Sequence, residues 1–230
     1  MKLAVQIFLL LAFGLSASAQ TRPASVLIDE FQNGNCEEIW ARLDMLAVQM
    51  NNDPSATGTV SISGVVNDVR DNLYYEAMVV GYFADRRMSD RVNIIRTALQ
   101  QKRHFELWLT PANSEPPVVH PAEWPLEYPE NAKPFIFTER ENYMVTVSVC
   151  LPVDELALLA KVLGVNPKAR TNVVLKVPSH KEFALRKRKV IKILTTNYSI
   201  PRSQIRIFEQ LGFKKDPHGI ESNTEYWLVP

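Results

Sequence analysis

Apolar positions along the chain follow two spacings, one typical of strands and one typical of helices. In the first half, the strand-type run SVLIDEF (residues 25–31) is followed by a helix-type run after Cys36 and then by the β-branched run TGTVSISG (residues 57–64). The apolar residues of the predicted helix recur every three or four positions, as one buried stripe requires: Ile39, Leu43, Leu46, Ala47 and Met50. These runs predict a β-α-β unit.

The second half repeats this order of elements. The strand-type run YMVTVSV (residues 143–149) precedes Cys150, an amphipathic helix follows, and TNVVLKV (residues 171–177) is a second β-branched run. A proline ends each predicted helix, Pro54 at 18 residues after Cys36 and Pro167 at 17 residues after Cys150. The shared register predicts an internal repeat.

The parallel extends to the end of each half, where ELWLTP (residues 106–111) returns as EYWLVP (residues 225–230). Between these points each half has a second helical run and a further strand, at residues 73–84 and 91–96 in the first half and at 182–197 and 204–208 in the second. We therefore predict an α+β fold of two tandem β-α-β-α-β-β modules, each with two helices packed on one face of a mixed sheet. The alternative is a single α+β domain whose halves are similar by accident.

Prolines are concentrated between the two halves, in residues 111–134. Because proline lacks an N–H donor and has a fixed φ angle, this composition favours an extended connector. We predict a first module at residues 24–111, a linker at 112–134 and a second module at 135–230. The linker's aromatic residues, Trp124 and Tyr128, are expected to pack onto a module rather than to bind a ligand.

The first 19 residues have the pattern of a secretory signal peptide. Lys2 precedes an apolar run at residues 3–15, and Ala17-Ser18-Ala19 fits a small-x-small cleavage site. An uncleaved membrane anchor is the alternative, but the run is shorter than the roughly 20 residues that span a bilayer. We expect an exported protein with no transmembrane segment after signal removal.

Two cysteines in an exported chain have one intramolecular pairing, Cys36 with Cys150. Both precede the first helix of a module, so a pseudo-twofold arrangement of the modules would bring them together. We predict this disulfide; the alternatives are two buried thiols or a bridge between chains.

Charge is unevenly distributed although the whole chain is near neutral. Residues 167–215 contain 13 lysines and arginines, and their only acidic residues are Glu182 and Glu209. Four of the cations are consecutive, at residues 186–189, and we expect no acidic neighbour for them at helical spacing. Arg186, Arg188 and Lys189 are therefore candidate ligand-binding residues for an anionic partner, whereas the simpler alternative is a solvated helix face. No nucleic-acid recognition motif accompanies the charge.

The element order and two stretches, QMNNDP...TVSISG and ILTTNYSIPRSQIRIF, resemble the C-terminal domain family of outer-membrane protein A, once per module. The stretch DEFQNGNCEEIWARLDMLAVQMNNDPSATG is also similar to exported acidobacterial proteins of unassigned role. The first resemblance implies a periplasmic or cell-envelope protein of a Gram-negative-type bacterium. It also implies peptidoglycan binding without cleavage, through an aspartate after the second strand and an arginine on the second helix that hold diaminopimelate.

This pair of residues is incomplete in both halves. The first half offers Asn67 or Asp68 for the aspartate, but Glu76 and Ala77 stand where the arginine is expected. The second half offers Arg186 or Arg188, but no aspartate follows its second strand. Family-type binding is thus a hypothesis from fold and compartment.

No catalytic pattern is evident in the sequence. The histidines lack metal-ligand spacing, and nucleophile and phosphate-loop motifs are absent. A Cys150-His180 nucleophile is the alternative. We expect no enzyme activity, no cofactor and no metal. The predicted function is a non-catalytic envelope protein that binds peptidoglycan or another anionic wall component through its basic second module; the alternative is a periplasmic protein-interaction or structural module.

Overall fold

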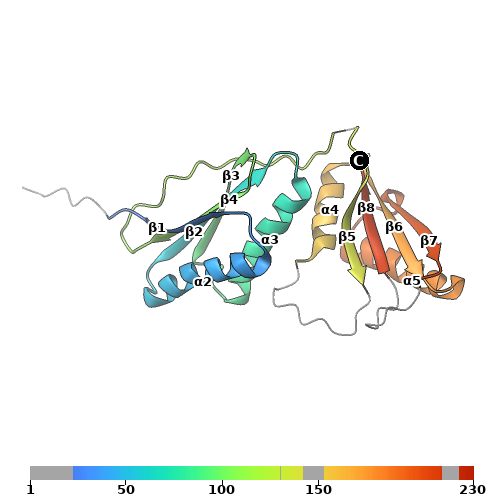
Figure 1. Cartoon of the computed structure of the whole chain (residues 1–230), viewed down its shortest axis with the longest axis horizontal. Helices are drawn as coiled ribbons and strands as arrows, with labels where there is room; N and C mark the ends of the chain where they lie inside the picture. Colours follow the sequence, from blue (N-terminus) through green and yellow to red (C-terminus); the bar gives the residue numbers. More distant parts are fainter. Residues whose placement is uncertain (1–22, 130, 142–152, 214–222) are drawn as a thin grey trace, which may run out of the picture.

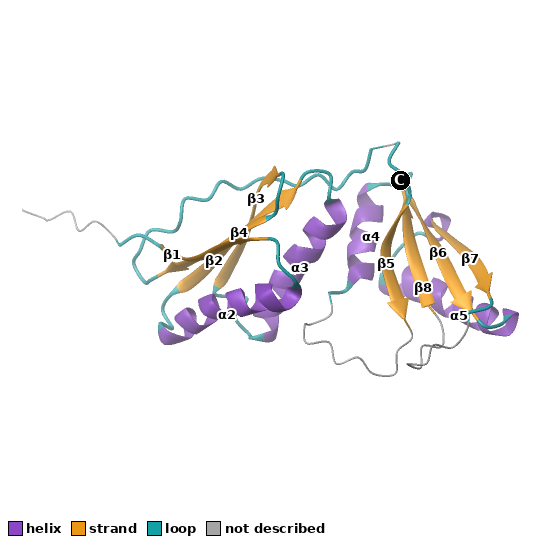
Figure 2. Ribbon diagram, viewed as in Figure 1, coloured by secondary structure: helices purple, strands orange, loops and turns teal. Residues whose placement is uncertain are grey.

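A computed structural model of the chain describes residues 23–129, 131–141, 153–213 and 223–230. In this part of the chain, two α+β units follow one another, each with two α-helices and one four-stranded mixed sheet (Figure 1). Both helices of a unit lie on one face of its sheet (Figure 2). The predicted fold class is confirmed. The proposed signal peptide lies outside the described residues.

The first sheet has the strand order β1-β4-β2-β3, in which β2 and β3 are parallel and the other neighbours are antiparallel. Helix α2 begins after Asn35, which forms a capping box with Glu38, and α3 begins after Asp68, which accepts from the Asp71 N–H. The elements are β1 (Val26–Gln32), α2 (Cys36–Asn52), β2 (Thr57–Val65), α3 (Val69–Asp85), β3 (Val92–Gln100) and β4 (His104–Thr110).

The second sheet repeats this topology with the order β5-β8-β6-β7 and a parallel β6-β7 pair. Its second helix, α5, continues into a short π-helix at Ile193–Asn197, and a 3₁₀ turn at Arg202–Gln204 precedes β7. The elements are β5 (Phe135–Glu141), α4 (Glu155–Val165), β6 (Arg170–Val177), α5 (His180–Lys192), β7 (Ile205–Leu211) and β8 (Asn223–Val229).

The repeated phrase at the end of each half has the same position and the same contact in both sheets. It forms β4 and β8, which each lie between the first strand and the second strand of their unit. The indole N–H of Trp108 donates to Glu106 at 3.1 Å, and that of Trp227 donates to Glu225 at 2.9 Å. The similarity of the two phrases is therefore structural and not accidental.

The first strand of the second unit differs from the prediction. We expected residues 143–149, which lie outside the described residues, whereas the strand observed beside β8 is β5, Phe135–Glu141. Phe137 is buried in the second core and Phe135 packs against it, so two aromatic residues supply the inward face. The polar end of this strand and its bulge between Ile136 and Thr138 obscure the alternation in the sequence.

Helix α2 crosses the sheet closely because β2 has a glycine where the helix approaches. A Cβ atom at Gly58 would lie 2.8 Å from the Met50 sulfur, closer than side chains pack. The helix buries the stripe predicted from its sequence: Ile39, Leu43, Leu46, Ala47 and Met50. This contact positions α2, and with it the first core.

Helix α3 contributes to both hydrophobic cores. Its second half packs in the first core through Met78, Val79, Tyr82 and Phe83. Leu73, near its start, is 1% exposed and belongs to the core of the second unit. The helix therefore joins the two units by apolar burial as well as by the chain connection.

The proline-rich connector is extended and packs onto both units, as predicted. Trp124 is buried in the first core and donates its indole N–H to the Thr97 carbonyl at 2.8 Å. Leu126 and Tyr128 pack on the second core, where the Asn166 side chain accepts from the Tyr128 N–H and donates to the Leu126 carbonyl. The linker is thus a fixed part of the fold.

We predict that Trp124→Ala lowers the free energy of unfolding by about 3 kcal/mol, because it removes a buried indole from the first core. Trp124→Phe retains most of the apolar contact and loses one hydrogen bond, for a cost of about 1 kcal/mol. Urea unfolding followed by circular dichroism measures both changes. Val118→Ala, at a linker residue that is 88% exposed, is the control and should leave stability unchanged. Equal stability of Trp124→Ala and wild type would contradict the proposed anchoring.

Candidate functional site

Helix α5 carries the predicted ligand-binding residues, and it is packed differently from the other helices. Ser179 caps its start by accepting from the Glu182 N–H, and none of its residues is fully buried. Phe183 and Val190 make partial contacts with the second core. Most of the helix circumference is consequently available to a partner.

Arg186 differs from the other two predicted residues. Its side chain is 19% exposed, and its guanidinium donates to the Glu182 carboxylate at 2.5 Å, one helical turn earlier. The expectation that the basic run has no acidic neighbour at helical spacing is therefore wrong. Glu182 is four residues before Arg186, and this i,i+4 geometry allows the pair to form.

Arg188 and Lys189 are exposed, as are Lys181 and Lys192 on the same helix. None of these four forms an ion pair with another residue that the structure describes, whereas Lys176 on β6 is paired with Glu225. Leu185, between them, is 65% exposed. We define the basic face as Lys181, Leu185, Arg188, Lys189 and Lys192.

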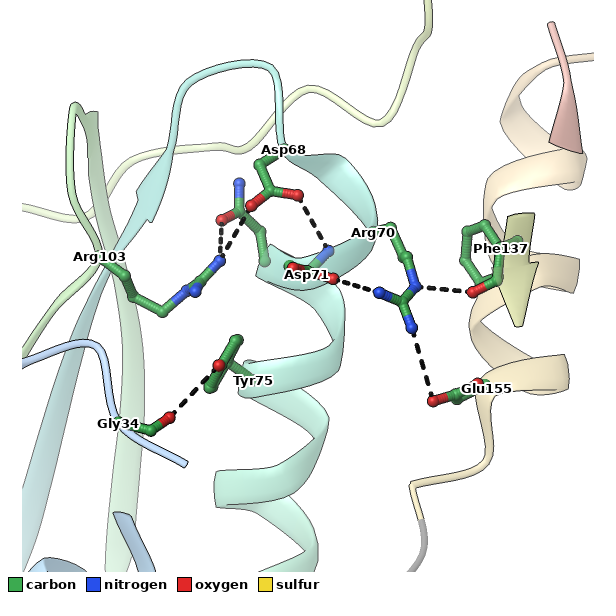
Figure 3. A network of polar contacts seen from close by, with 9 residues as sticks. Gly34, Asp68, Arg70, Asp71, Tyr75, Arg103, Phe137 and Glu155 are labelled. Atoms are coloured by element: carbon green, nitrogen blue, oxygen red, sulfur yellow. Dashed lines mark hydrogen bonds and ion pairs between the residues drawn. The ribbon is translucent and has the colours of Figure 1, made fainter. Parts of the chain in front are cut away.

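A second polar cluster surrounds the start of α3, where the resemblance places its aspartate (Figure 3). Arg103, from the β3-β4 turn, reaches Asp68 at 3.4 Å and the Asn72 side chain at 3.2 Å, and its guanidinium lies 4.0 Å from the Tyr75 ring centre. Asn72 in turn bonds both the N–H and the carbonyl of Val65. The cluster ties the end of β2 to the helix.

Arg103 is the residue that sequence reasoning missed at this cluster. The resemblance places an arginine on the helix, near Glu76, but Glu76 accepts two hydrogen bonds of 2.6 Å from Arg96. The sheet topology explains why Arg103 lies near Asp68. Because β3 is parallel to β2, the turn after β3 must lie at the same edge of the sheet as Asp68, which follows β2. With a side chain only 5% exposed, Arg103 neutralises Asp68 inside the fold and is not available to a ligand.

Arg70 connects the same region to the second unit. Its Nε donates to the Phe137 carbonyl at 2.6 Å, its Nη1 contacts Asp71 at 2.7 Å, and its Nη2 lies 3.9 Å from Glu155 on α4 (Figure 3). The guanidinium is thus shared between a backbone carbonyl and two carboxylates. Its contacts are internal to the fold and fix the position of β5 relative to α3.

A cleft of about 670 Å³ opens beside this junction, between the loop after β2, the linker and β5. Its wall is mainly apolar, including Val66, Leu99 and Phe135. Its charged lining residues are Asp68, Arg70, Asp71 and Glu127. The volume suits a small ligand. Burial raises the pKa of Tyr128, which lines the cleft, to about 12, and the Asp68 carboxylate adds to the rise.

The remaining site predictions have different outcomes. Cys36 begins α2 and has no free thiol, but Cys150 lies outside the described residues, so the Cys36-Cys150 disulfide and the Cys150-His180 alternative stay predictions. His180 is paired with Glu209 at 2.8 Å. In the described ranges, no cluster of three His, Cys, Asp or Glu side chains could hold a metal ion. Nor does any helix found there have the length and apolar character that crossing a membrane requires.

We predict a pH dependence of stability from Tyr128. Its pKa of about 12 in the folded protein exceeds the value near 10 of an unfolded tyrosine, so folding favours the neutral phenol. The stabilisation is complete below pH 10 and is lost as pH rises toward 12. The difference in unfolding free energy between wild type and Tyr128→Phe should therefore be constant from pH 7 to 9.5 and change above pH 10, in urea titrations. A difference that is independent of pH up to 11.5 would contradict the burial of this phenol.

Comparisons with known proteins complete the description of the site. We find no protein-family model, no curated protein and no solved structure that matches this chain.

Proposed function

We propose that the chain is a non-catalytic protein of the periplasm or cell envelope that binds peptidoglycan or another anionic wall component through the basic face of α5. One observation carries this proposal: four cations on one helix are exposed and have no carboxylate partner among the described residues. Elsewhere in the described chain, cations such as Arg42, Arg86 and Arg96 are paired with carboxylates.

Repulsion among these cations makes the basic face unfavourable for an isolated helix. Like charges at i,i+4 spacing destabilise a helix by a few tenths of a kcal/mol, and Arg188 and Lys192 have this spacing. A bound anionic polymer screens this repulsion. The polymer is also attracted to all of these cations at the same time. The interaction is between exposed charges, so salt should weaken it strongly.

The face differs from the clamp that the family resemblance implies. A clamp needs an aspartate and an arginine that both reach the ligand, but Asp68 and Arg103 satisfy each other and the second unit has Ser179 at the start of its second helix. Binding by distributed charge needs no such pair. Binding of this kind selects acidic polymers as a class and does not depend on the recognition of one particular chemical group.

Protein interaction without wall binding is the alternative function. The exposed Leu185 at the centre of the basic face favours it, because an apolar side chain surrounded by charge is typical of protein interfaces. The sedimentation experiment described next separates the two functions, because only the first function requires binding to the cell wall.

We predict that the chain from residue 20 onward sediments with isolated peptidoglycan sacculi at low salt and is released at high salt. Arg188→Glu/Lys189→Glu should raise the apparent Kd about tenfold or more, because two attractive charges become repulsive. Arg186 is left unchanged, since its pair with Glu182 belongs to the fold.

The matched control is Arg87→Glu/Lys102→Glu, which makes the same charge change at two exposed cations of the first unit. This control should retain wild-type sedimentation. Equal loss of sedimentation in both variants would mean that net charge, and not the basic face, determines binding. A wild type that does not sediment at any salt concentration would overturn the proposal and leave protein interaction as the function.

A further inference from the structure

The two sheets have equivalent outer strands, β3 and β7. Each is the last strand in its sheet order, and each is parallel to the central strand before it. Ile95 of β3 pairs with the residue of β2 that faces Glu106, and Phe208 of β7 pairs with the residue of β6 that faces Glu225. Ile95 and Phe208 are therefore the same position of the repeat.

The outer edge of β3 is covered by the linker. Ala122 donates its N–H to the Arg96 carbonyl at 2.9 Å, and the Trp124 indole donates to the next carbonyl, that of Thr97. Ile95 is partly buried beside this segment. The first unit thus satisfies its edge strand with an extended piece of its own chain.

The outer edge of β7 has no equivalent cover in the part of the chain that the structure describes. Phe208 is 46% exposed and Leu211 is 45% exposed on this strand. An edge with unpaired backbone groups and exposed apolar side chains is a template for another strand. The equivalent edge of β3 accepts an extended segment that donates N–H groups to its carbonyls, so a segment of this kind also suits β7.

Another outer strand of the described chain, β1, lies at the opposite end of the first sheet from β3. Val26 and Leu27 are 51% and 39% exposed on β1, and Glu30 is exposed as well. Residues 23–25, just before this strand, contact Glu115. β1 thus offers apolar side chains and a carboxylate, while β7 offers apolar side chains and the exposed Arg206.

The two edges belong to units at opposite ends of the long axis of the molecule (Figure 1). They cannot pair within one chain. We propose that β1 of one copy adds to the outer edge of β7 of another, so that copies join head to tail through a continuous sheet. Such an interface is heterologous, and its repetition produces an open chain of copies rather than a closed dimer.

This assembly is separate from wall binding but would strengthen it. Each added copy contributes another basic face to the same particle, so several weak contacts act together on one polymer. The acidic character of the first half and the basic character of the second favour the same head-to-tail contact.

The test uses two variants that each block one edge. Phe208→Glu and Leu27→Lys each place a charge among the apolar side chains of one edge, which burial at the proposed interface disfavours. Sedimentation velocity of wild type should show a mass that rises with concentration beyond the dimer, whereas each variant alone should sediment as a monomer. Circular dichroism verifies that both variants are folded.

A mixture of the two variants is the decisive measurement. Each variant retains one intact edge, so the mixture should form a heterodimer and stop there. Val48→Lys, at an exposed apolar residue of α2, is the control and should assemble like wild type. A monomeric wild type, unaffected assembly of the Phe208→Glu variant, or a mixture that stays monomeric would each overturn the proposal.

Failure of this proposal is distinguishable from failure of wall binding. Arg188→Glu/Lys189→Glu should still assemble beyond the dimer while its apparent Kd for sacculi rises about tenfold or more. The two edge variants should still bind sacculi, with lower apparent affinity. Loss of both properties in every variant would mean that neither surface acts as proposed.

Discussion

The burial of α3 in two cores is the constraint on which the arrangement of the molecule depends. A helix that contributes to one core alone can rotate with its own unit. With Leu73 in the second core and Tyr82 and Phe83 in the first, α3 fixes the distance and the angle between the two sheets. Arg70 adds a polar contact at the same place, since its hydrogen bond to the Phe137 carbonyl holds β5 beside the helix.

The linker follows from the same constraint. Between two rigidly placed units it has a fixed span, and Trp124 and Tyr128 attach it to each core. Proline lowers the conformational freedom of the unfolded connector, so the ordered path costs less entropy than a flexible one. In this path the linker also covers β3, which explains why only the second unit presents the corresponding edge.

The sequence predicts the fold better than the site because the two depend on different kinds of pattern. The helical stripe of α2, the β-branched strands and the repeated phrase are local, and burial enforces each of them. The partner of Asp68 is not local, since Arg103 is 35 residues away and reaches it only through the parallel pairing of β2 and β3. The sequence pattern does not predict the position of β5 for a related reason. The inward aromatic residues of this strand precede a charged end, and the more regular run at residues 143–149 matches the repeat better.

The two units preserve the frame of the repeat while differing in charged residues and in the partners of those residues. Arg96 on β3 is held by Glu76 of α3, and at the equivalent position of the second sheet Glu209 is held by His180 of α5. On the helix-free face, Glu106 contacts Ser61 and Glu225 contacts Lys176. In each case the charged side chain has a local partner, so the fold tolerates the difference. The exposed cations of the basic face of α5 lack such partners among the described residues, and this local concentration of unpaired charge, rather than the total charge, is the basis on which we propose the helix as a binding surface.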